Sequence, residues 1–598
     1  MAGTPTVLCA NGCHTPQSTS RQAGAQDGTD VAPPVEQGPA PHASARRASE
    51  GHHASSDPRL CCSAVICYSC DGNRTCRRPE RPRQAHTEGL AVDAASLAQF
   101  LITFLAVLSA LFVFSVGLGA LTLAILFVVD VRQTQHAIRR NFPVIGRLRY
   151  TFEHLGVFFR QYFFAMDREE MPFNRAQRSW VYRAAKNLDN TQPFGSTRDL
   201  RPAGTILFAN ATFPSLQPSP ARATPIVVGP DCAQPYQAHS LFNISAMSYG
   251  AISRVAVLAL SNGARMARCW MNTGEGGLSP HHLAGGADIV FQIGTAKYGV
   301  CDAMGRLDEA KLRRIAAHPQ VRMFEIKLSQ GAKPGKGGIL PAAKVSAEVA
   351  AIRGIPMGEP SLSPSRHPEI DTTGHLLDFV ERVRHLTGKP TGFKLVLGDP
   401  AWLDDLCAEI GRRGMDSAPD FITIDSGDGG TGAAPASLMD YVGLPIQESL
   451  PLAVDKLAAS GLRDRIRIIA SGKLVTPADV AWALCVGADF VNSARGFMFS
   501  LGCIQSMQCN KNTCAAGIAT QDPRLQRGLD PTDKAERVRH YVENLVKEVG
   551  LIAHACGVDD PRQLRREHCR IVSGPGRSVP LSELYPADKA GRTTPRAA

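Results

Sequence analysis

Three cysteines in the last fifth of the chain have the spacing of a ligand set. Cys503, Cys509 and Cys514 fall within twelve residues, separated by five and then four residues. Three thiolates this close in sequence can ligate an iron–sulfur cluster. The spacing alone leaves two alternatives open, which are a zinc site and three buried free cysteines.

Glycine-rich turns follow three strand-like runs in the second half of the chain. The residues that we single out in and beside these turns are Ser426, Gly427, Asp428, Gly429, Gly430, Gly472, Lys473 and Arg495. Glycine lets backbone N–H groups approach phosphate oxygens, and barrel enzymes commonly build phosphate sites at their last strand ends. Tight turns use the same residues, but three such turns together favour a cofactor that carries phosphate.

Two lysines lie within apolar strand-like runs, where an unpaired charge would be costly. Lys327 falls in the run MFEIKL and Lys394 in GFKLVLG. One interpretation is a lysine that is ion-paired within the core. The other is a cation that faces a carboxylate substrate or the electron-rich edge of a reduced flavin.

The elements that must position these residues alternate between strands and helices. Short β-branched runs end in glycine or polar residues and are followed by helical stretches, as expected for parallel βαβ units. The runs are FNISAM, DIVFQIG, MFEIKL, GFKLVLG, FITIDSG, IRIIASG and DFVNSAR. With one more strand near Met271, they predict an α/β fold, a (β/α)8 TIM barrel over residues 241–526. The candidate residues then share the C-terminal face of the barrel. An open doubly wound sheet is the alternative, but it would show one dominant glycine-rich turn.

Residues 97–129 are apolar and uncharged, which predicts a transmembrane segment before the barrel. The segment could form one long tilted helix or two short ones that break near Gly117 and Gly119. Five arginines follow it between residues 132 and 149, and residues 84–96 before it contain no Lys or Arg. The positive-inside rule therefore predicts a membrane-anchored protein with its catalytic barrel on the cytoplasmic side.

The other regions carry no recognisable chemistry. Residues 1–94 have the composition of a disordered, low-complexity tail, where a CxxC at Cys67 and Cys70 lacks the surrounding hydrophobic pattern of a zinc knuckle. Residues 130–240 are expected to be a lead-in region that packs on the barrel, and residues 527–598 a helical extension. The net charge of +11 is concentrated in the tail and beside the apolar segment. No basic stripe is interleaved with aromatic residues, so nucleic-acid binding is not expected.

Five motifs, in order along the chain, carry a family resemblance. They are MSYGAIS from residue 247, NTGEGGLSP from 272, EIKLSQGAKPGKGGILP from 325, DSGDGGTGAAP from 425 and GCIQSMQCNKNTCAAGIATQ from 502. Together they resemble the FMN-binding synthase domain of glutamate synthase. The long lysine–glycine motif and the cysteine trio are highly specific in combination.

The resemblance implies a role for each matching position. Met247, Ser248 and Gly250 would line the flavin and the substrate, and Glu275 would lie near the substrate. Gln330, Lys333 and Arg353 would hold the carboxylates of 2-oxoglutarate. Lys394 would contact the flavin ring, and the glycine-rich turns with Lys473 and Arg495 would border the FMN cofactor and its phosphate. Cys503, Cys509 and Cys514 would ligate a [3Fe-4S] cluster.

The implied reaction is the condensation of ammonia with 2-oxoglutarate to 2-iminoglutarate, followed by hydride transfer from reduced FMN to give L-glutamate. No glutaminase domain and no dinucleotide fingerprint are recognisable in this sequence. We therefore expect electrons from a partner, such as ferredoxin or an NAD(P)H-oxidising protein. Ala515 and Ala516 replace the usual Pro-Val after the third cysteine. Two alternatives stay open: an N-methylglutamate synthase that uses methylamine, and a membrane-anchored flavin and iron–sulfur redox relay without amino-acid turnover.

Overall fold

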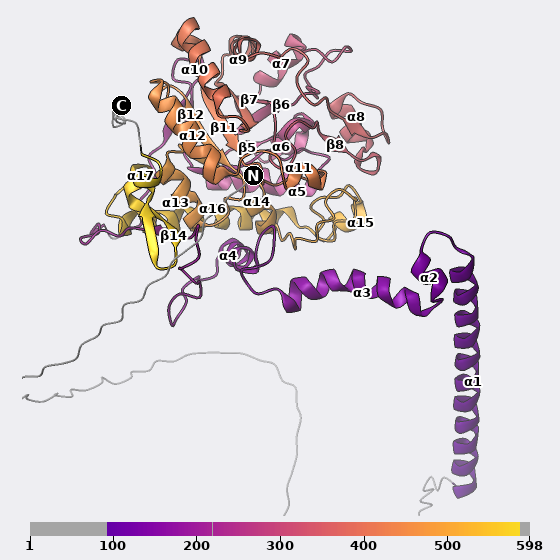
Figure 1. Ribbon diagram of the computed structural model, residues 1–598. Helices are drawn as coiled ribbons and strands as arrows, with labels where there is room; N and C mark the ends of the chain where they lie inside the picture. Colours follow the sequence, from indigo (N-terminus) through magenta and orange to yellow (C-terminus); the bar gives the residue numbers. More distant parts are fainter. Residues whose placement is uncertain (1–92, 218, 587–598) are drawn as a thin grey trace, which may run out of the picture. The chain divides into compact units, whose positions relative to one another are not determined.

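A computed structural model of the protein describes residues 93–217 and 219–586 (Figure 1). The expected disordered tail and its CxxC motif lie outside the described residues, apart from the last two positions of the tail. The chain divides into two units within its first helix, after Leu111, and the barrel and both flanking regions belong to the second unit.

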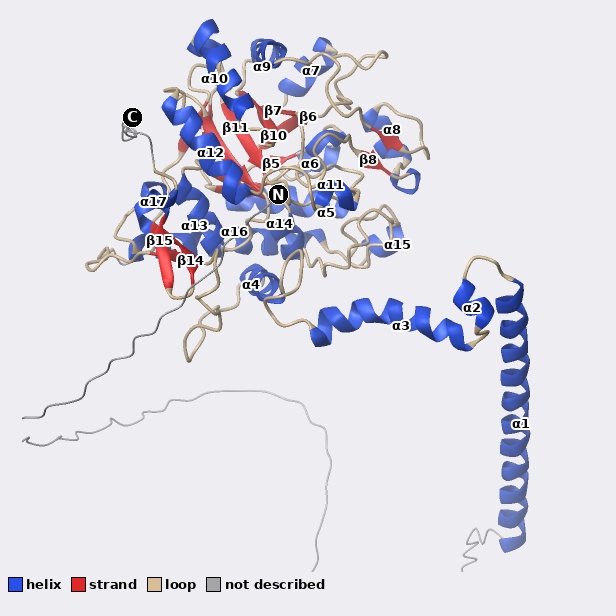
Figure 2. Ribbon diagram, in the orientation of Figure 1, coloured by secondary structure: helices blue, strands red, loops and turns tan. Residues whose placement is uncertain are grey.

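Eight parallel strands close into a barrel in the order β10-β11-β12-β13-β4-β5-β6-β7. Figure 2 shows these strands inside a layer of helices. Their apolar and β-branched residues are buried on both faces, as expected for parallel strands covered by helices. The strands are β4 (Phe242–Ile244), β5 (Met271–Asn272), β6 (Ile289–Ile293), β7 (Val321–Lys327), β10 (Thr391–Val396), β11 (Phe421–Asp425), β12 (Arg467–Ser471) and β13 (Phe490–Ser493). The predicted (β/α)8 barrel is confirmed, including the short strand at Met271.

Helices and short turns connect the barrel strands. Side-chain caps start several of them; for example, Ser253 accepts a hydrogen bond from the backbone N–H of Ala256. The helices are α5 (Arg254–Ala267), α6 (Pro280–Ala284), α7 (Glu309–Ala316), α8 (Ala347–Arg353), α9 (Thr373–Thr387), α10 (Ala401–Arg413), α11 (Ala436–Met439), α12 (Ile446–Ala459), α13 (Pro477–Val486), α14 (Arg495–Ser500) and α15 (Pro523–Gln526). The 3₁₀ turns are η2 (Gly274–Gly276), η3 (Ala342–Lys344) and η4 (Met415–Ser417), and a small hairpin pairs β8 (Ile339–Leu340) with β9 (Ser361–Leu362).

The barrel interior contains a buried polar layer centred on Glu325 of β7. Its carboxylate accepts hydrogen bonds from the Asn272 amide at 2.8 Å, the Gln292 amide at 2.6 Å and the Thr423 hydroxyl at 2.7 Å. A buried carboxylate with three donors is well compensated. These bonds join strands β5, β6, β7 and β11, so they fix the strands that carry the site residues described below.

The C-terminal region contains a long helix and a small sheet. Helix α16 (Pro531–Ala555) packs closely on α5, because a Cβ at Gly263 would come within 2.5 Å of the Val538 side chain. Strands β14 (Cys569–Gly574) and β15 (Arg577–Pro580) form an antiparallel sheet with β1 (Ile206–Phe208). Short turns η5 (Pro561–Gln563), η6 (Arg566–His568) and α17 (Leu581–Leu584) complete the region. The extension is therefore not purely helical, and it shares a sheet with the lead-in region.

The lead-in region contains four helical segments and a hairpin. They are α2 (Ala137–Asn141), α3 (Ile145–Phe159), the π-helical turn η1 (Arg160–Phe164), α4 (Arg175–Ala185), and the paired strands β2 (Ile226–Val228) and β3 (Tyr236–Ala238). Helix α4 packs on α16, where the Trp180 indole donates to Glu548 at 3.2 Å and Asn544 donates to the carbonyl of Ala184 at 2.9 Å. The second half of this region thus packs on the C-terminal helix α16.

The apolar segment forms one uninterrupted helix, α1 (Ala94–Arg132). It passes through Gly117 and Gly119 without a break, so the alternative of two short helices is wrong. At 1.5 Å per residue, its 39 residues extend over roughly 58 Å. By length and composition it could cross a membrane, and its apolar side chains are exposed throughout.

Candidate active site

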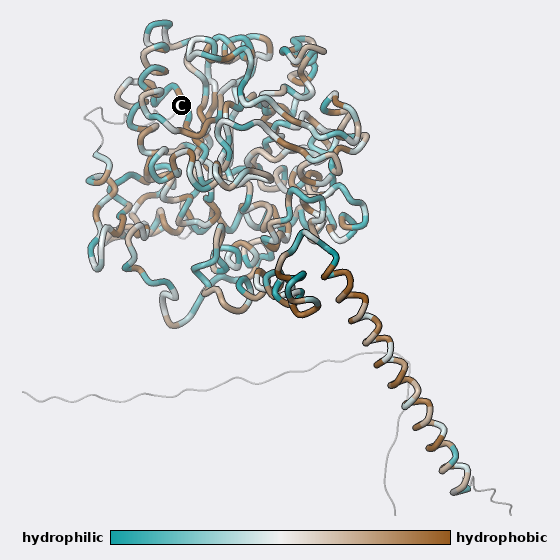
Figure 3. The backbone as a smooth tube through the Cα atoms, turned by 45° about the vertical axis from the view of Figure 1, so that its right-hand side comes forward, coloured by the Kyte–Doolittle hydropathy of each residue, from teal (hydrophilic) through white to brown (hydrophobic). Residues whose placement is uncertain are grey.

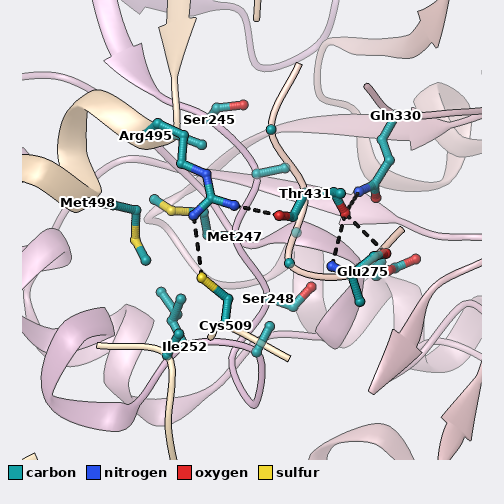
Figure 4. Close-up of a pocket in the computed structure, with 18 of the residues that line it drawn as sticks. Ser245, Met247, Ser248, Ile252, Glu275, Gln330, Thr431, Arg495, Met498 and Cys509 are labelled. Carbon is teal, nitrogen blue, oxygen red and sulfur yellow. Dashed lines mark hydrogen bonds between the residues drawn. The ribbon is translucent and has the colours of Figure 1, made fainter. Parts of the chain in front are cut away.

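A pocket opens at the C-terminal ends of the barrel strands, where the sequence places the candidate residues. Figure 4 shows several of its lining side chains. The predicted site residues that line it are Met247, Ser248, Glu275, Gln330, Lys333, Lys394, Gly430, Gly472, Lys473, Arg495 and Cys509. They come from the ends of β4, β5, β7, β10, β11, β12 and β13, so loops far apart in sequence converge on one cavity.

The remaining predicted residues do not line the pocket: Gly250, Arg353, Ser426, Gly427, Asp428, Gly429, Cys503 and Cys514. Ser426 is fully buried, and its hydroxyl accepts a hydrogen bond from the backbone of Ile446 at 3.0 Å. A Cβ at Gly427 would overlap the backbone of Gly443. Ser426 and Gly427 therefore hold the turn after β11 by packing against Gly443 and Ile446.

Glu275 is the acidic centre of the pocket. Its carboxylate pairs with the ammonium of Lys327 at 2.8 Å, and both side chains are largely buried. Burial alone would raise the pKa of Glu275, but Lys327, Lys333 and Arg353 together hold that pKa at about 2. Glu275 is therefore an anion at neutral pH. The ion-paired interpretation of Lys327 is the one that the structure supports.

Two glycines make room for Glu275. An added Cβ at Gly338 would overlap the carboxylate of Glu275. An added Cβ at Gly294 would come within 2.6 Å of the Cβ of Glu275. Gly337 is equally constrained, because its Cβ would overlap the carbonyl of Ser363. The lysine–glycine–glycine motif thus allows its loop to close directly over the acidic centre.

Three further cations surround this centre. The buried Lys333 has its pKa lowered to about 8, first by burial and then by the nearby charge of Lys327. Lys394 pairs with Asp425 at 3.5 Å. Arg353 donates to the carbonyl of Tyr249 at 3.2 Å and lies over the Tyr298 ring, and its Nε has no hydrogen-bond partner among the described residues.

The β7 and β11 loops touch through their backbones. A Cβ at Gly331 would overlap the carbonyl of Ser426, and the amide of Gly331 donates to Asp425 at 3.0 Å. Gln330 donates to the Thr431 hydroxyl at 3.1 Å across the same junction. The predicted substrate-binding loop and the predicted cofactor-binding loop are therefore one connected structure.

Gly472 and Lys473 form the next part of the rim. Gly472 has a φ of +117°, in the region that favours glycine, and a Cβ there would overlap the Ser426 side chain. Lys473 pairs with Asp428 at 2.7 Å. The two glycine-rich turns after β11 and β12 thus lie against each other.

Arg495 joins the glycine-rich rim to the cysteine loop. Its guanidinium donates to the carbonyl of Thr431 and to Sγ of Cys509, the latter at 3.7 Å, as Figure 4 shows. A Cβ at Gly430 would come within 3.0 Å of its Nε. Gly430 therefore lets this guanidinium lie flat along the β11 loop.

The cysteine loop wraps tightly beside the pocket. Gln505, Met507 and Asn512 all have φ values between 53° and 62°, which is uncommon outside glycine. Burial raises the pKa of Cys503, and Cys514 is buried. Lys344 donates to the carbonyl of Cys509 at 2.7 Å. Among the described residues, no group of three or more His, Cys, Asp or Glu is arranged to hold a metal ion.

The pocket has an excess of positive charge. Two acidic side chains, Glu275 and Asp425, face five cationic ones, which are Lys333, Lys344, Lys394, Lys473 and Arg495. A concave site lined mainly by one sign of charge attracts ligands of the opposite sign. This pocket is therefore suited to anionic ligands.

Sequence reasoning missed Asp425, Thr431 and Lys344. Asp425 ends a strand that the sequence predicts, so an acid at a strand end was an available signal. Thr431 follows the glycine turn directly, but its contacts reach Gln330, which is 101 residues away. Lys344 gives no signal of its own, because its contacts depend on two loops that are distant in sequence.

Comparisons with known proteins agree with this geometry. The family described as "Conserved region in glutamate synthase" matches residues 203–559. The glutamate synthase large subunit-like protein YerD of Bacillus subtilis is 40% identical over 520 residues, which cover 80% of this chain and 98% of that protein. The archaeal glutamate synthase [NADPH] of Methanocaldococcus jannaschii is 37% identical over 345 residues, 57% of this chain and 62% of that protein.

Among solved structures, a flavocytochrome b2 mutant with bound benzoylformate aligns with 71% of this chain and 86% of its own, at 14% identity and a TM-score of 0.40. The barrel and its charged pocket define an α/β-barrel enzyme. The chain belongs to the glutamate synthase family.

Proposed function

We propose that this enzyme catalyses the reductive amination of 2-oxoglutarate to L-glutamate through 2-iminoglutarate, with FMN and an iron–sulfur cluster as cofactors. The observation that carries the proposal is the set of cations around Glu275 in a pocket bordered by glycine-rich strand ends. The two ends of this pocket suit two anions, a dicarboxylate and a phosphate.

The β11, β12 and β13 ends would hold FMN. Gly430 and Gly472 line the pocket, and Lys473 and Arg495 supply positive charge beside them. Glycine-rich backbone and cations are the usual elements of a phosphate site. Lys394, at the end of β10, would lie against the flavin ring. When bound, FMN supplies the hydride that reduces the imine carbon.

Lys333 and Gln330 would bind 2-oxoglutarate. Lys333 lies close enough to Lys327 for their charges to interact, so a dicarboxylate between the cations would relieve their repulsion. Gln330 is oriented by Thr431 and can donate to a carboxylate or keto oxygen. Arg353 does not line the pocket. We propose that it acts electrostatically, because its positive charge helps to keep Glu275 ionised while its hydrogen bond to the carbonyl of Tyr249 holds it in place.

Glu275 would position the amine. Its carboxylate stays ionised because Lys327 neutralises it. An ionised carboxylate can accept a hydrogen bond from ammonia and so hold the amine in place. Ammonia, rather than a larger amine, is the proposed nitrogen donor.

Cys503, Cys509 and Cys514 would ligate the [3Fe-4S] cluster. The loop offers three partly or fully buried sulfur atoms, with the cations Arg495 and Lys344 close to one of them. Buried cysteines near cations suit an anionic cluster, whose binding would deprotonate them. A partner protein such as ferredoxin would supply the electrons. Helix α1 would anchor the enzyme in a membrane, with the barrel on the cytoplasmic side.

The test is an anaerobic reaction with the purified full chain. The protein is reduced with dithionite to its end point, and 2-oxoglutarate is added with ammonium or with methylamine. Flavin reoxidation with ammonium and the formation of glutamate are the expected result. Faster reaction with methylamine would assign N-methylglutamate synthesis instead. A flavin that stays reduced with both amines would contradict amino-acid synthesis and favour a redox relay.

The cluster ligands are tested by Cys509→Ser, with Cys301→Ser as the matched control on a partly buried barrel cysteine. We expect iron and acid-labile sulfide to fall to background in Cys509→Ser while the flavin is retained, and both to stay unchanged in Cys301→Ser. Unchanged iron content in Cys509→Ser would show that this cysteine is not a ligand.

A further inference from the structure

Helix α3 has an apolar face that nothing in the described chain covers. Ile145, Leu148, Phe152, Leu155 and Phe159 recur at alternating steps of three and four residues, so they lie on one side of the helix. Their exposed fractions are 72%, 54%, 64%, 41% and 40%. A helix of a soluble domain normally buries such a stripe against its core.

The aromatic residues after α3 extend this face. Phe158, Tyr162, Phe163 and Phe164 are each at least 45% exposed. Phe158 lies in the last turn of α3 and the other three in the π-helical turn η1, and the ring centroids of Phe158 and Tyr162 are 4.9 Å apart. Aromatic rings are enriched where a protein meets the headgroup region of a bilayer.

The charges around the helix are mostly positive. Residues 130–160 contain six arginines and two acidic residues, Asp130 and Glu153, for a net charge of 6 − 2 = +4. Arg149 and Glu153 pair at 3.1 Å on the exposed side. A basic amphipathic helix is attracted to anionic lipid headgroups, which neither a neutral surface nor a second basic copy of this segment would match.

The start of α3 is held at the end of the membrane-type helix α1. Asp130, in the last turn of α1, pairs with Arg139 and Arg147 at 2.8 Å each. It also accepts the backbone N–H of Val144, a β-branched residue with a φ of +66°. Asp130 therefore fixes the turn that leads into α3, and the apolar face begins where the apolar span ends. Figure 3 shows the hydrophobic character of α1.

We propose that residues 145–164 lie in the headgroup region of an anionic bilayer, with their apolar and aromatic face toward the acyl chains. The protein then contacts the membrane twice, through the span α1 and through this interfacial helix. The inference depends on α1 spanning the bilayer and is independent of the reaction that the barrel catalyses.

The experiment compares two tryptophan variants of the full chain, Phe152→Trp on the apolar face and Glu153→Trp on the polar face. Both positions are exposed, so neither change disturbs a packed core. Each protein is reconstituted at one chain per vesicle into phosphatidylcholine and phosphatidylglycerol with brominated acyl chains. The fluorescence of the four native tryptophans is measured on the unsubstituted chain and serves as the baseline for both variants.

We expect the bromolipid to quench the added fluorescence of Phe152→Trp by about twofold or more and to leave that of Glu153→Trp unchanged, because only one face enters the lipid. Pure phosphatidylcholine should give weaker quenching. Equal quenching at both positions, or none, would overturn the proposal. A blue-shifted but unquenched Phe152→Trp signal would show that this face packs against the same chain and would also overturn the proposal. Failure of the chain to float with vesicles would overturn the span and this inference together.

Discussion

The mouth of the barrel buries charged groups, whereas α1 and α3 expose apolar ones. At the barrel mouth, Lys327 and Glu275 are almost inaccessible to water and are matched by further cations. In α3, large side chains such as Phe152 are exposed, and the nearest fully buried charge is Asp130 at the end of α1. The two regions thus reverse the usual distribution of polar and apolar side chains.

The reversal has a different cause in each region. Buried charges at the barrel mouth are stable because they are paired, and their surplus of cations prepares the pocket for anions. Exposed apolar side chains are stable when the surroundings are lipid rather than water. The barrel mouth is therefore suited to anionic ligands, and we infer that the leading helices are suited to a membrane.

We expect the largest effect on activity when one cation of the barrel mouth is removed. We expect Lys333→Ala to lower kcat/KM for 2-oxoglutarate by about 100-fold or more, because a buried charged partner of the substrate is lost. FMN content should not change. Lys336→Ala, which removes an exposed lysine of the same loop, is the control and should leave kcat/KM unchanged. Loss of FMN with unchanged turnover per bound flavin would assign Lys333 to the cofactor instead.

Filling the space around Glu275 should lower both the free energy of unfolding and the activity. In Gly338→Ala, the added Cβ would overlap the Glu275 carboxylate, so the loop must move. We expect the free energy of unfolding to fall by about 1–3 kcal/mol, the usual cost of overpacking. Gly398→Ala is the control, since a Cβ there meets nothing within 4 Å. Equal urea-unfolding midpoints for the two variants would show that the loop accommodates the methyl group without strain.

The buried cations should make substrate binding depend on pH. Lys333 has a pKa of about 8, so it is protonated below that pH and loses its charge above it. We expect the affinity for 2-oxoglutarate to be nearly constant below pH 7 and to fall above pH 8, by up to about tenfold per unit. Lys333→Arg should remove this fall, because arginine stays charged. A fall that persists in Lys333→Arg would assign the titration to another group.

The sequence predicts the barrel well but not its charge network. β-branched runs with glycine or polar residues at their ends report seven strands locally, whereas the two-residue strand at Met271 was expected only because a barrel needs an eighth strand. The pairing of Glu275 with Lys327 joins residues 52 apart, and Glu325 gathers partners from three other strands. Such contacts depend on barrel closure and leave no local pattern. The apolar spacing of α3 was visible in the sequence, but its exposure is a property of the folded chain.

The smallest expected effect concerns the link between α1 and α3. Asp130→Asn keeps the shape of the side chain and removes the charge that Arg139 and Arg147 share. Both arginines are partly exposed, so solvent screening limits the stabilisation that is lost with the two ion pairs. We expect backbone amides of residues 137–147 to exchange with deuterium about tenfold faster, while unfolding of the barrel is unchanged. Asp167→Asn, which breaks an exposed ion pair with Arg175 outside this link, should leave exchange in 137–147 as it is. Unchanged exchange in Asp130→Asn would show that the backbone turn, rather than the buried carboxylate, holds α3 at the end of α1.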